Sequence, residues 1–332
     1  MSAPQIVVVG SYATGLTMKV RRLPSSGETL MGHGYRVDFG GKGSNQTVGC
    51  ARLGAQVQFV CQIGNDRFGD MAFALYREEG IGVVHAKRSA SVPTGVGFIV
   101  VEQESGRNCI VIDPGANALL SPADVAEAET AMRSATVVLT QLEMPVAAAA
   151  SAMERGRANG AITVLNPAPA CALPASVLSS VDVLTPNESE AKVLAGYAAD
   201  APVEPQVVAQ KLIGSGVKHV VITLGEQGAL LVNTDSQTHF PAVKVQAIDT
   251  TGAGDAFNAG LAVALSHGSS LEKAVEFGTV TGAMAVTKEG VIPSLPRREE
   301  VLTFLRDHEM AAPEWLGSIA APDPRTDNTQ SI

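Results

Sequence analysis

The chain has no long uninterrupted apolar stretch that could anchor it in a bilayer. No run approaches the ~18–20 apolar residues that a membrane-spanning helix needs. The amino-terminal Met-Ser-Ala-Pro-Gln segment carries no basic region, and the apolar run at 6–9 is too short for a signal peptide. We therefore expect a soluble, cytoplasmic protein that does not associate with membranes.

Cysteine and histidine are scarce and scattered. The four cysteines form no Cys-x-x-Cys pair, and the six histidines form no His-x-x-x-His pair. No cysteine stands at a metal-binding spacing from a histidine, so we predict no structural zinc. Apolar or small residues surround each cysteine, which predicts reduced thiols in or near the core at Cys50, Cys61, Cys109 and Cys171.

Charged residues are also few, at 17% of the chain against 45% hydrophobic residues, and this balance predicts a sizeable core. The net charge of −9 argues against nucleic acid or an anionic membrane surface as a general partner. A small anionic ligand is still compatible with this charge, because helix amino termini and a few lysines bind phosphate locally. A length of 332 residues allows one large α/β domain or two average ones.

What the chain does contain is a regular alternation of short apolar runs with helical stretches. The run at 6–9 is β-branched and ends at Gly10, as expected for a parallel strand buried on both faces. Similar runs recur at 57–61, 137–140, 162–165, 181–184 and 220–223. Helical stretches lie between them at 43–53, 68–79, 145–158, 189–194 and 207–213. The alternation predicts an α/β fold with helices on both faces of a parallel sheet.

The last part of the chain has a different pattern. Apolar runs at 230–233 and 238–241 follow each other closely and predict an antiparallel edge of the sheet. Two long helices are expected after them, at 254–266 and 271–287.

Two early regions break the alternation and predict a small separate sheet. Residues 17–22 and 30–38 alternate around a Pro-Ser-Ser-Gly turn, and 95–101 with 108–113 flank the hairpin signal Glu104-Ser-Gly-Arg107. These pieces cannot cross over as βαβ units, so we expect them to project from the main domain. The alternative is that they are simple hairpin decorations.

The most informative segment is a glycine-rich turn that opens into a helix, Asp249-Thr-Thr-Gly-Ala-Gly-Asp255. Gly252 and Gly254, with Ala253 between them, allow a close approach to a ligand, and the first amides of the helix favour an anion. Asp255 is then placed to take the proton from a hydroxyl that attacks a phosphoryl group. The alternative is a loop that only caps a structural helix.

A second glycine-rich segment, Phe39-Gly-Gly-Lys-Gly-Ser-Asn45-Gln, also precedes a helix. It is not a phosphate-binding P-loop, because Lys42 is followed by glycine and no glycine stands at the required earlier position. Its glycines let backbone amides approach a polyol, Asn45 can donate to and accept from vicinal hydroxyls, and Lys42 adds positive charge. The alternative is a helix-starting turn with a solvated lysine.

Together the two motifs resemble the signatures of the ribokinase-like (PfkB) carbohydrate kinases, and within that family they are closest to the ribokinases. The resemblance covers residues 5–305. It implies a three-layer α/β/α domain over 1–308, with a mostly parallel central sheet. It also implies that the small sheet is a lid over the sugar, formed by 14–22, 29–39 and 93–113.

The resemblance implies an ATP- and Mg²⁺-dependent kinase, activated by K⁺, that phosphorylates a primary hydroxyl of a small sugar, with ribose the leading substrate. The alternatives are a kinase for another sugar, a ketose, a sugar acid or a nucleoside, and a non-catalytic sugar sensor. In the family the outer face of the lid often packs against a second subunit, which implies a homodimer. The tail at 309–332 has no periodicity, and we expect it to be loosely ordered.

The resemblance also assigns roles to individual residues. The sugar would be held by Gly41, Lys42, Gly43, Asn45, Glu143 and Asp255. The nucleotide would be bound by Asn187, Thr223, Gly225, Gly228, Gly254 and Thr279. Glu190 and Asn187 would order the waters of Mg²⁺. The ligands of K⁺ would be Asp249, Thr251, Ala285, Lys288, Gly290 and Ser294.

Without the resemblance, three of these segments have ordinary structural explanations. Residues 187–190 are then a helix N-cap with acids in the first turn, and 223–228 are a β-turn with glycine at a positive-φ position. Glu143 is then a solvated loop acid.

One segment departs from the ribokinase pattern. Ribokinases have Ser-x-Asn-x-Asp after the first strand, and its Asn and Asp bind sugar hydroxyls, whereas this chain has Ser11-Tyr-Ala-Thr-Gly15. Ala13 and Gly15 therefore leave out a charge-assisted contact to two hydroxyls. Either Tyr12 or Thr14 takes over this contact, or the substrate is not ribose.

Overall fold

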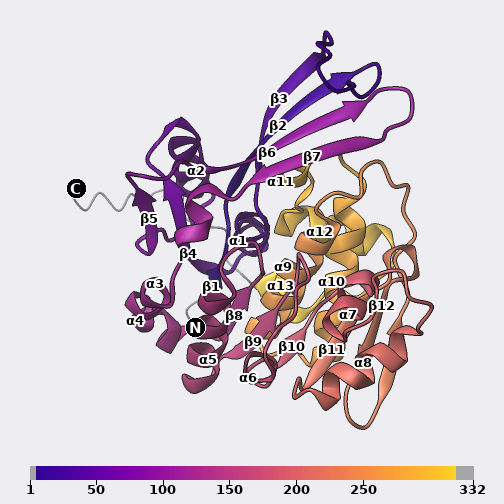
Figure 1. Ribbon diagram of the computed structural model, residues 1–332. Coiled ribbons are helices and arrows are strands. Elements are labelled where there is room, and N and C mark those ends of the chain that lie inside the picture. The colour runs from indigo at the N-terminus through magenta and orange to yellow at the C-terminus, as the bar shows by residue number, and fades with distance from the viewer. Residues whose placement is uncertain (1–4, 319–332) are drawn as a thin grey trace.

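The computed structural model describes residues 5–318, and its core is one large, mostly parallel sheet between helices (Figure 1). The strand order is β13-β12-β11-β10-β9-β8-β1-β4-β5. These strands are β1 (Gln5–Val9), β4 (Gln56–Gly64), β5 (Ala86–Ser89), β8 (Val137–Thr140), β9 (Ile162–Leu165), β10 (Val183–Leu184), β11 (His219–Thr223), β12 (Ala229–Val232) and β13 (Gln237–Phe240). Pairing is parallel from β11 to β5, and β12 and β13 form the predicted antiparallel edge.

Two apolar clusters, one on each face of the sheet, hold the helices in place. Side chains alternate along β1, so Ile6 and Val8 belong to one cluster while Val7 and Val9 belong to the other. The first cluster packs against α1 (Lys42–Arg52), α2 (Arg67–Glu78), α9 (Ala253–Ser266), α10 (Leu271–Ala285) and α12 (Arg298–Asp307). The second packs against α3 (Pro122–Glu127), α4 (Glu129–Ser134), α5 (Val146–Ala158), α6 (Ala175–Leu178), α7 (Glu188–Leu194) and α8 (Pro205–Gly214). The predicted three-layer α/β/α architecture is confirmed.

Shorter helices complete the described chain. They are η1 (Gly115–Leu119), η2 (Gly225–Gln227), α11 (Val291–Ser294) and α13 (Glu314–Ser318). No helix of residues 5–318 is long and apolar enough to cross a membrane.

A second, four-stranded sheet projects from the main domain (Figure 1). Its order is β3-β2-β6-β7, formed by β2 (Ala13–Val20), β3 (His33–Gly40), β6 (Gly95–Glu102) and β7 (Asn108–Asp113). The two central strands, β2 and β6, are parallel, and each pairs with its outer neighbour in antiparallel fashion. The separate small sheet expected from the sequence is therefore present, and we call it the lid sheet.

The carboxyl-terminal region differs from the loosely ordered tail that was expected to begin at 309. Residues 314–318 form α13, in which Leu316 is fully buried and the Trp315 ring stacks on His267 at 4.5 Å between centroids. Arg298 Nε donates to the carbonyl of Leu316 at 2.7 Å. Two large apolar side chains give this segment enough burial to stay on the domain. Residues 319–332 lie outside the described part of the chain.

The prediction of near-core thiols is wrong for one cysteine. Cys50 and Cys61 are fully buried, as predicted, and Cys171 is half-buried. Cys109 is exposed, because it lies on β7 at the edge of the lid sheet, where every residue of the strand faces solvent. The apolar neighbours of Cys109 in the sequence suggested a core position, but β7 of the lid sheet is not part of a core.

Candidate active site

A cavity of about 1200 Å³ opens at the carboxyl ends of the central strands. Asn166 follows β9, Thr185 follows β10 and Thr223 ends β11, so the cavity lies where ligands bind in open α/β sheets. Lys42 reaches it from the start of α1. The lining also includes every residue that was predicted to bind nucleotide: Asn187, Thr223, Gly225, Gly228, Gly254 and Thr279.

Asp255 stands in the first turn of α9 and is almost wholly buried. Its two carboxylate oxygens accept hydrogen bonds from Asn45 Nδ2 at 2.8 Å and from Gln46 Nε2 at 2.9 Å. The turn before it depends on Gly252, whose φ of 85° is left-handed and whose place has no room for a β-carbon beside Val291. The two glycine-rich motifs therefore meet at one carboxylate.

Burial and charge act in opposite directions on this carboxylate. Burial raises the pKa of Asp255, and the nearby Lys42 charge together with the two amide donors only partly lowers it again. Burial alone would lower the pKa of Lys42, but the charges of Asp255, Glu143 and Glu190 raise it above its usual value. The site thus pairs a carboxylate whose proton affinity is increased with a lysine that stays charged.

The amides around Asp255 form a buried network that the sequence did not reveal. Gln46 Nε2 also donates to Asn166 Oδ1 at 3.0 Å, and Gln141 Nε2 donates to Gln46 Oε1 at 2.6 Å. Gln46 is part of the second motif, and Gln141 and Asn166 directly follow strands, which was the available signal. Asn45 Oδ1 is buried and has no hydrogen-bond partner within residues 5–318, so it can accept from a hydroxyl.

The turn before α9 presents backbone amides to the cavity. The amides of Gly252, Gly254 and Asp255 have no acceptor among the described residues, whereas the Ala253 amide donates to Thr250 O at 3.3 Å. Asn258 Nδ2 braces the turn by donating to Gly254 O at 2.8 Å. Free amides at the start of a 14-residue helix form an anion site.

Two glycines of the second motif allow close contact between α1 and the segment that follows β1. Gly41 has a φ of 87°, and a β-carbon there would lie 2.7 Å from Tyr12 Cα. A β-carbon at Gly43 would lie 2.4 Å from the Ser11 amide nitrogen. The glycines thus allow α1 to start against the Ser11–Ala13 backbone, and their predicted sugar contacts stay predictions.

Glu143 lies beside Lys42, as the sequence suggested, but its contacts are to the protein. Its Oε2 atom accepts from Ser11 Oγ at 2.7 Å and from the Lys42 amide at 2.8 Å. These bonds fix the start of α1 in front of the cavity. A contact from Glu143 to a sugar hydroxyl remains a prediction.

Asn187 and Glu190 form a capping box at the start of α7. Asn187 Oδ1 accepts from the Glu190 amide, and Glu190 Oε2 accepts from the Asn187 amide, each at 2.8 Å. The N-cap interpretation is therefore confirmed. Both side chains also line the cavity with oxygen atoms, the donors that Mg²⁺ prefers, so the pair fits an ion held through water. Within residues 5–318 no three His, Cys, Asp or Glu side chains gather as a metal site by themselves.

The residues predicted to hold K⁺ are partly brought together. Asp249 Oδ1 accepts from the Thr251 amide at 2.9 Å, and Asp249 Oδ2 accepts from the Gly290 amide at 3.0 Å. The Lys288 side chain instead pairs with Glu300 at 2.6 Å, which leaves only its backbone carbonyl for an ion. Ser294 is buried and its hydroxyl donates to Val291 O at 2.8 Å. The oxygen-rich set around Asp249, with Ala285 at the end of α10, fits a monovalent cation.

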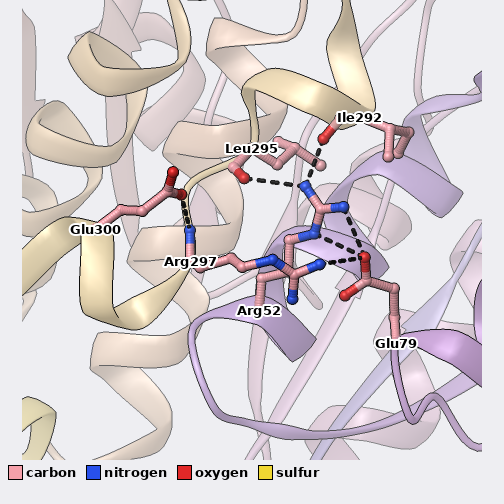
Figure 2. Close-up of polar contacts among 6 residues, drawn as sticks. All are labelled: Arg52, Glu79, Ile292, Leu295, Arg297 and Glu300. Atoms are coloured by element: carbon pink, nitrogen blue, oxygen red, sulfur yellow. Dashed lines mark hydrogen bonds and ion pairs between the residues drawn. The ribbon is translucent and has the colours of Figure 1, made fainter.

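An ion-pair network around the buried Arg52 and Glu79 side chains holds the segment that contains α11 (Figure 2). Arg52, in the last turn of α1, donates to Ile292 O at 2.5 Å and to Leu295 O at 3.1 Å. The same guanidinium pairs with Glu79 at 2.6 Å, and Arg297 joins that carboxylate at 3.0 Å. The end of α1 is thus tied to the loop next to Asp249.

Comparison with known proteins agrees with this geometry. The family model described as pfkB family carbohydrate kinase matches residues 3–298. Ribokinase of Haemophilus influenzae is 38% identical over 300 residues, which are 90% of this chain and 98% of that protein. Deoxyribokinase of Salmonella typhi is 33% identical over 305 residues, 92% and 99% of the two chains.

A solved structure shows the same architecture. Arabidopsis thaliana ribokinase complexed with ribose and ATP has a TM-score of 0.86 at 31% identity, over 92% of this chain and 99% of that one. The chain therefore belongs to the pfkB family of carbohydrate kinases, which are phosphotransferases that act on an alcohol group.

Proposed function

We propose that the protein is a ribokinase, which transfers the γ-phosphoryl group of ATP to a primary hydroxyl of ribose. The observation that carries this proposal is the buried Asp255 carboxylate beside the unpaired amides of Gly254 and Asp255 at the start of α9. The identity to Haemophilus influenzae ribokinase and the similarity to the Arabidopsis complex with ribose and ATP support the choice of both substrates.

In the proposed reaction the hydroxyl oxygen of the sugar forms a bond to the γ-phosphorus while the bond to the β–γ bridging oxygen breaks. The hydroxyl proton passes to Asp255, and ADP leaves. Asn45 and Gln46 hold the carboxylate in place from the side of α1. The free amides of Gly252 and Gly254 face the charge that develops on the transferred group.

Two ions complete the proposal. Glu190 with Asn187 would hold the waters of Mg²⁺ at the cavity wall, and the ion would neutralise charge on the nucleotide phosphates. Asp249 with the backbone oxygens of the 285–294 loop would hold K⁺, and the ion would strengthen the local field beside the anion turn. Along the chain, Gly252, Ala253, Gly254 and Asp255 follow Asp249 and precede the 285–294 loop, so the two parts of the proposed K⁺ site flank them.

We also propose a homodimer that forms through the outer face of the lid sheet. Val37, Leu16, Phe98 and Val111 are directly paired across the four strands and form one apolar row. Of these, Phe98 is 52% exposed and Val111 is 63% exposed. An exposed apolar row of this kind is typical of a protein interface. The cytoplasmic location stays a prediction.

A kinase assay with ATP across pentoses, deoxyribose, ketoses, sugar acids and nucleosides tests the function. We expect ribose to have the highest kcat/KM, and Asp255→Asn to abolish most of that activity. A higher kcat/KM for another acceptor would replace ribose in the proposal, and the departure at Ala13 and Gly15 is the reason to compare several acceptors. No phosphorylation of any acceptor by the folded protein would contradict the kinase itself.

A further inference from the structure

The structure rules out the two side chains that could have replaced the carboxylate missing at position 15. Tyr12 and Thr14 are both fully buried, and their hydroxyls face each other at 3.2 Å. Neither hydroxyl therefore reaches a ligand between the lid sheet and the main domain. If the sugar has a carboxylate partner on the lid sheet, it comes from another strand.

Asp38 of β3 lies directly opposite Gly15 of β2. The two residues are Cα partners in an antiparallel pair, so their side chains point to the same face of the lid sheet. A β-carbon placed on Gly15 would lie 3.8 Å from Asp38 Cβ. The carboxylate of Asp38 can therefore occupy the space that an acid at position 15 would have used.

This face of the lid sheet is turned toward the main domain. Arg36, two residues before Asp38 and on the same face of β3, reaches Glu289 at 2.8 Å. Glu289 precedes Gly290, whose amide is bound to Asp249 at the anion turn. Since β3 also contacts α11, the strand that carries Asp38 lies beside the loop that is bound to Asp249.

Space for a ligand lies next to Asp38. Gly15 pairs on its other side with Gly97 of β6, and a β-carbon on Gly97 would have no neighbour within 4 Å. The Arg36 guanidinium pairs with one carboxylate oxygen of Asp38 at 3.3 Å and orients it. The other oxygen, Oδ1, has no hydrogen bond within residues 5–318, so it can accept from a hydroxyl.

We propose that Asp38 is the sugar-binding carboxylate of this enzyme, transferred from β2 to the facing position on β3. It accepts hydrogen bonds from hydroxyls of the acceptor sugar, and Arg36 is its positioning residue. The inference rests on the proposed function, because it concerns the sugar that the kinase phosphorylates. Asp38 would then recognise the sugar hydroxyls in place of the acid that position 15 lacks.

The test measures KM and kcat for the preferred sugar of the wild type in Asp38→Ala and in Asp38→Asn. Loss of a charge-assisted hydrogen bond should raise KM about 10- to 150-fold, with kcat changed much less. Glu104→Ala is the matched control, since it removes an exposed acid from the turn between β6 and β7. Its KM should equal that of the wild type.

A rescue separates binding from a merely structural role. Gly15 has no left-handed φ, and a β-carbon placed there meets only ordinary van der Waals contacts, so Gly15→Asp is compatible with the fold. We expect the double variant Gly15→Asp with Asp38→Ala to have a KM well below that of Asp38→Ala and close to that of the wild type. Gly15→Asp alone should raise KM, because two carboxylates then crowd one another.

The outcomes are distinct. A KM that is unchanged in Asp38→Ala, on a sugar that the wild type phosphorylates, overturns the inference and leaves the proposed function standing. A raised KM that Gly15→Asp does not restore shows that Asp38 only shapes the lid sheet, and it also overturns the inference. A wild type that phosphorylates no sugar overturns both proposals.

Discussion

Asn45 on α1 donates a hydrogen bond to Asp255 on α9 at 2.8 Å, which joins the first turns of the two motif helices at the proposed base. The base is therefore positioned from a second helix, and its orientation does not depend on α9 alone. The contact is buried, so solvent does not compete for it.

The first prediction concerns Asp255 as general base. Asp255→Asn should bind ATP normally and lose at least about 10²-fold in kcat, the usual scale for removal of a general base. Steady-state kinetics and nucleotide binding by calorimetry measure the two effects. Asp70→Asn, at an exposed acid in the first turn of α2, is the control and should keep wild-type kcat. A kcat near that of the wild type in Asp255→Asn would remove Asp255 from this role.

The second prediction concerns pH. Burial raises the pKa of Asp255 above its usual 3.8, so the ionised base forms at a higher pH than an exposed aspartate would require. We expect kcat/KM to fall on the acid side with an apparent pKa above 3.8. A pH profile that stays flat down to that value, on protein shown to be folded, would contradict this assignment.

The same shift predicts an effect on stability. A carboxyl group whose pKa is higher in the folded state stabilises the fold below its unfolded pKa, and this contribution is lost as the pH rises through the folded pKa. At pH 7 the ionised Asp255 therefore destabilises the protein, whereas the amide introduced by Asp255→Asn stays neutral. We expect thermal unfolding of the variant at pH 7 to occur at or above the wild-type temperature. The difference should shrink toward pH 4, and a lower unfolding temperature at pH 7 would count against it.

The third prediction concerns the Arg52 network in Figure 2. Arg52→Met leaves Glu79, whose side chain is only 4% exposed, without its main partner. Breaking a buried pair in this way should lower the free energy of unfolding by about 3 kcal/mol. Denaturant unfolding measures the change, and adding Glu79→Leu should restore part of it. Arg133→Ala, in an exposed pair with Glu129, is the control and should cost less than about 1 kcal/mol.

The fourth prediction concerns monovalent cations. Activity should rise with K⁺ and respond less to Na⁺ or Li⁺. Asp249→Asn should weaken the K⁺ response, because both carboxylate oxygens accept from backbone amides and an asparagine has only one acceptor to offer. Asp235→Asn, in an exposed turn, provides the comparison. Activity that does not change with K⁺ in alkali-free buffer would discard the cation site.

The fifth prediction concerns the outer face of the lid sheet. Phe98→Glu places a charge in the exposed apolar row and should convert a dimer into a monomer, as measured by analytical ultracentrifugation. Glu104→Ala should leave the sedimentation coefficient unchanged. A monomeric wild type at micromolar concentration would show that this face is not a stable subunit interface.

The central sheet was predictable because its strands are continuous apolar runs buried on both sides. The strands β8 and β9 coincide with the predicted 137–140 and 162–165. The strand β5 was missed, because Lys87 and Arg88 give this edge strand a polar sequence. The helix α13 was missed because five residues show no period.

The candidate site also has a part that the sequence predicts and a part that it does not. The sequence pointed to Lys42, Asn45 and Asp255 because glycine-rich turns before helices leave a local pattern, and the structure brings these residues together. The amide network of Gln46, Gln141 and Asn166 joins residues that are distant in the chain, so no local sequence spacing predicts it. The position of Asp38 opposite Gly15 depends on strand register, which two separate alternating stretches do not specify.

The bond from Asn45 to Asp255 spans 210 residues, and that from Gln46 to Asp255 spans 209. During synthesis the amide side chains of α1 leave the ribosome long before their acceptor does. A nascent chain that ends before α9 already contains Asn45 and Gln46, but it lacks Asp255, the proposed base. The hydrogen bonds from these two amides to Asp255 cannot form in it. The proposed base is therefore absent until part of the last third of the chain has been translated, and we expect an amino-terminal fragment that ends before α9 to be inactive.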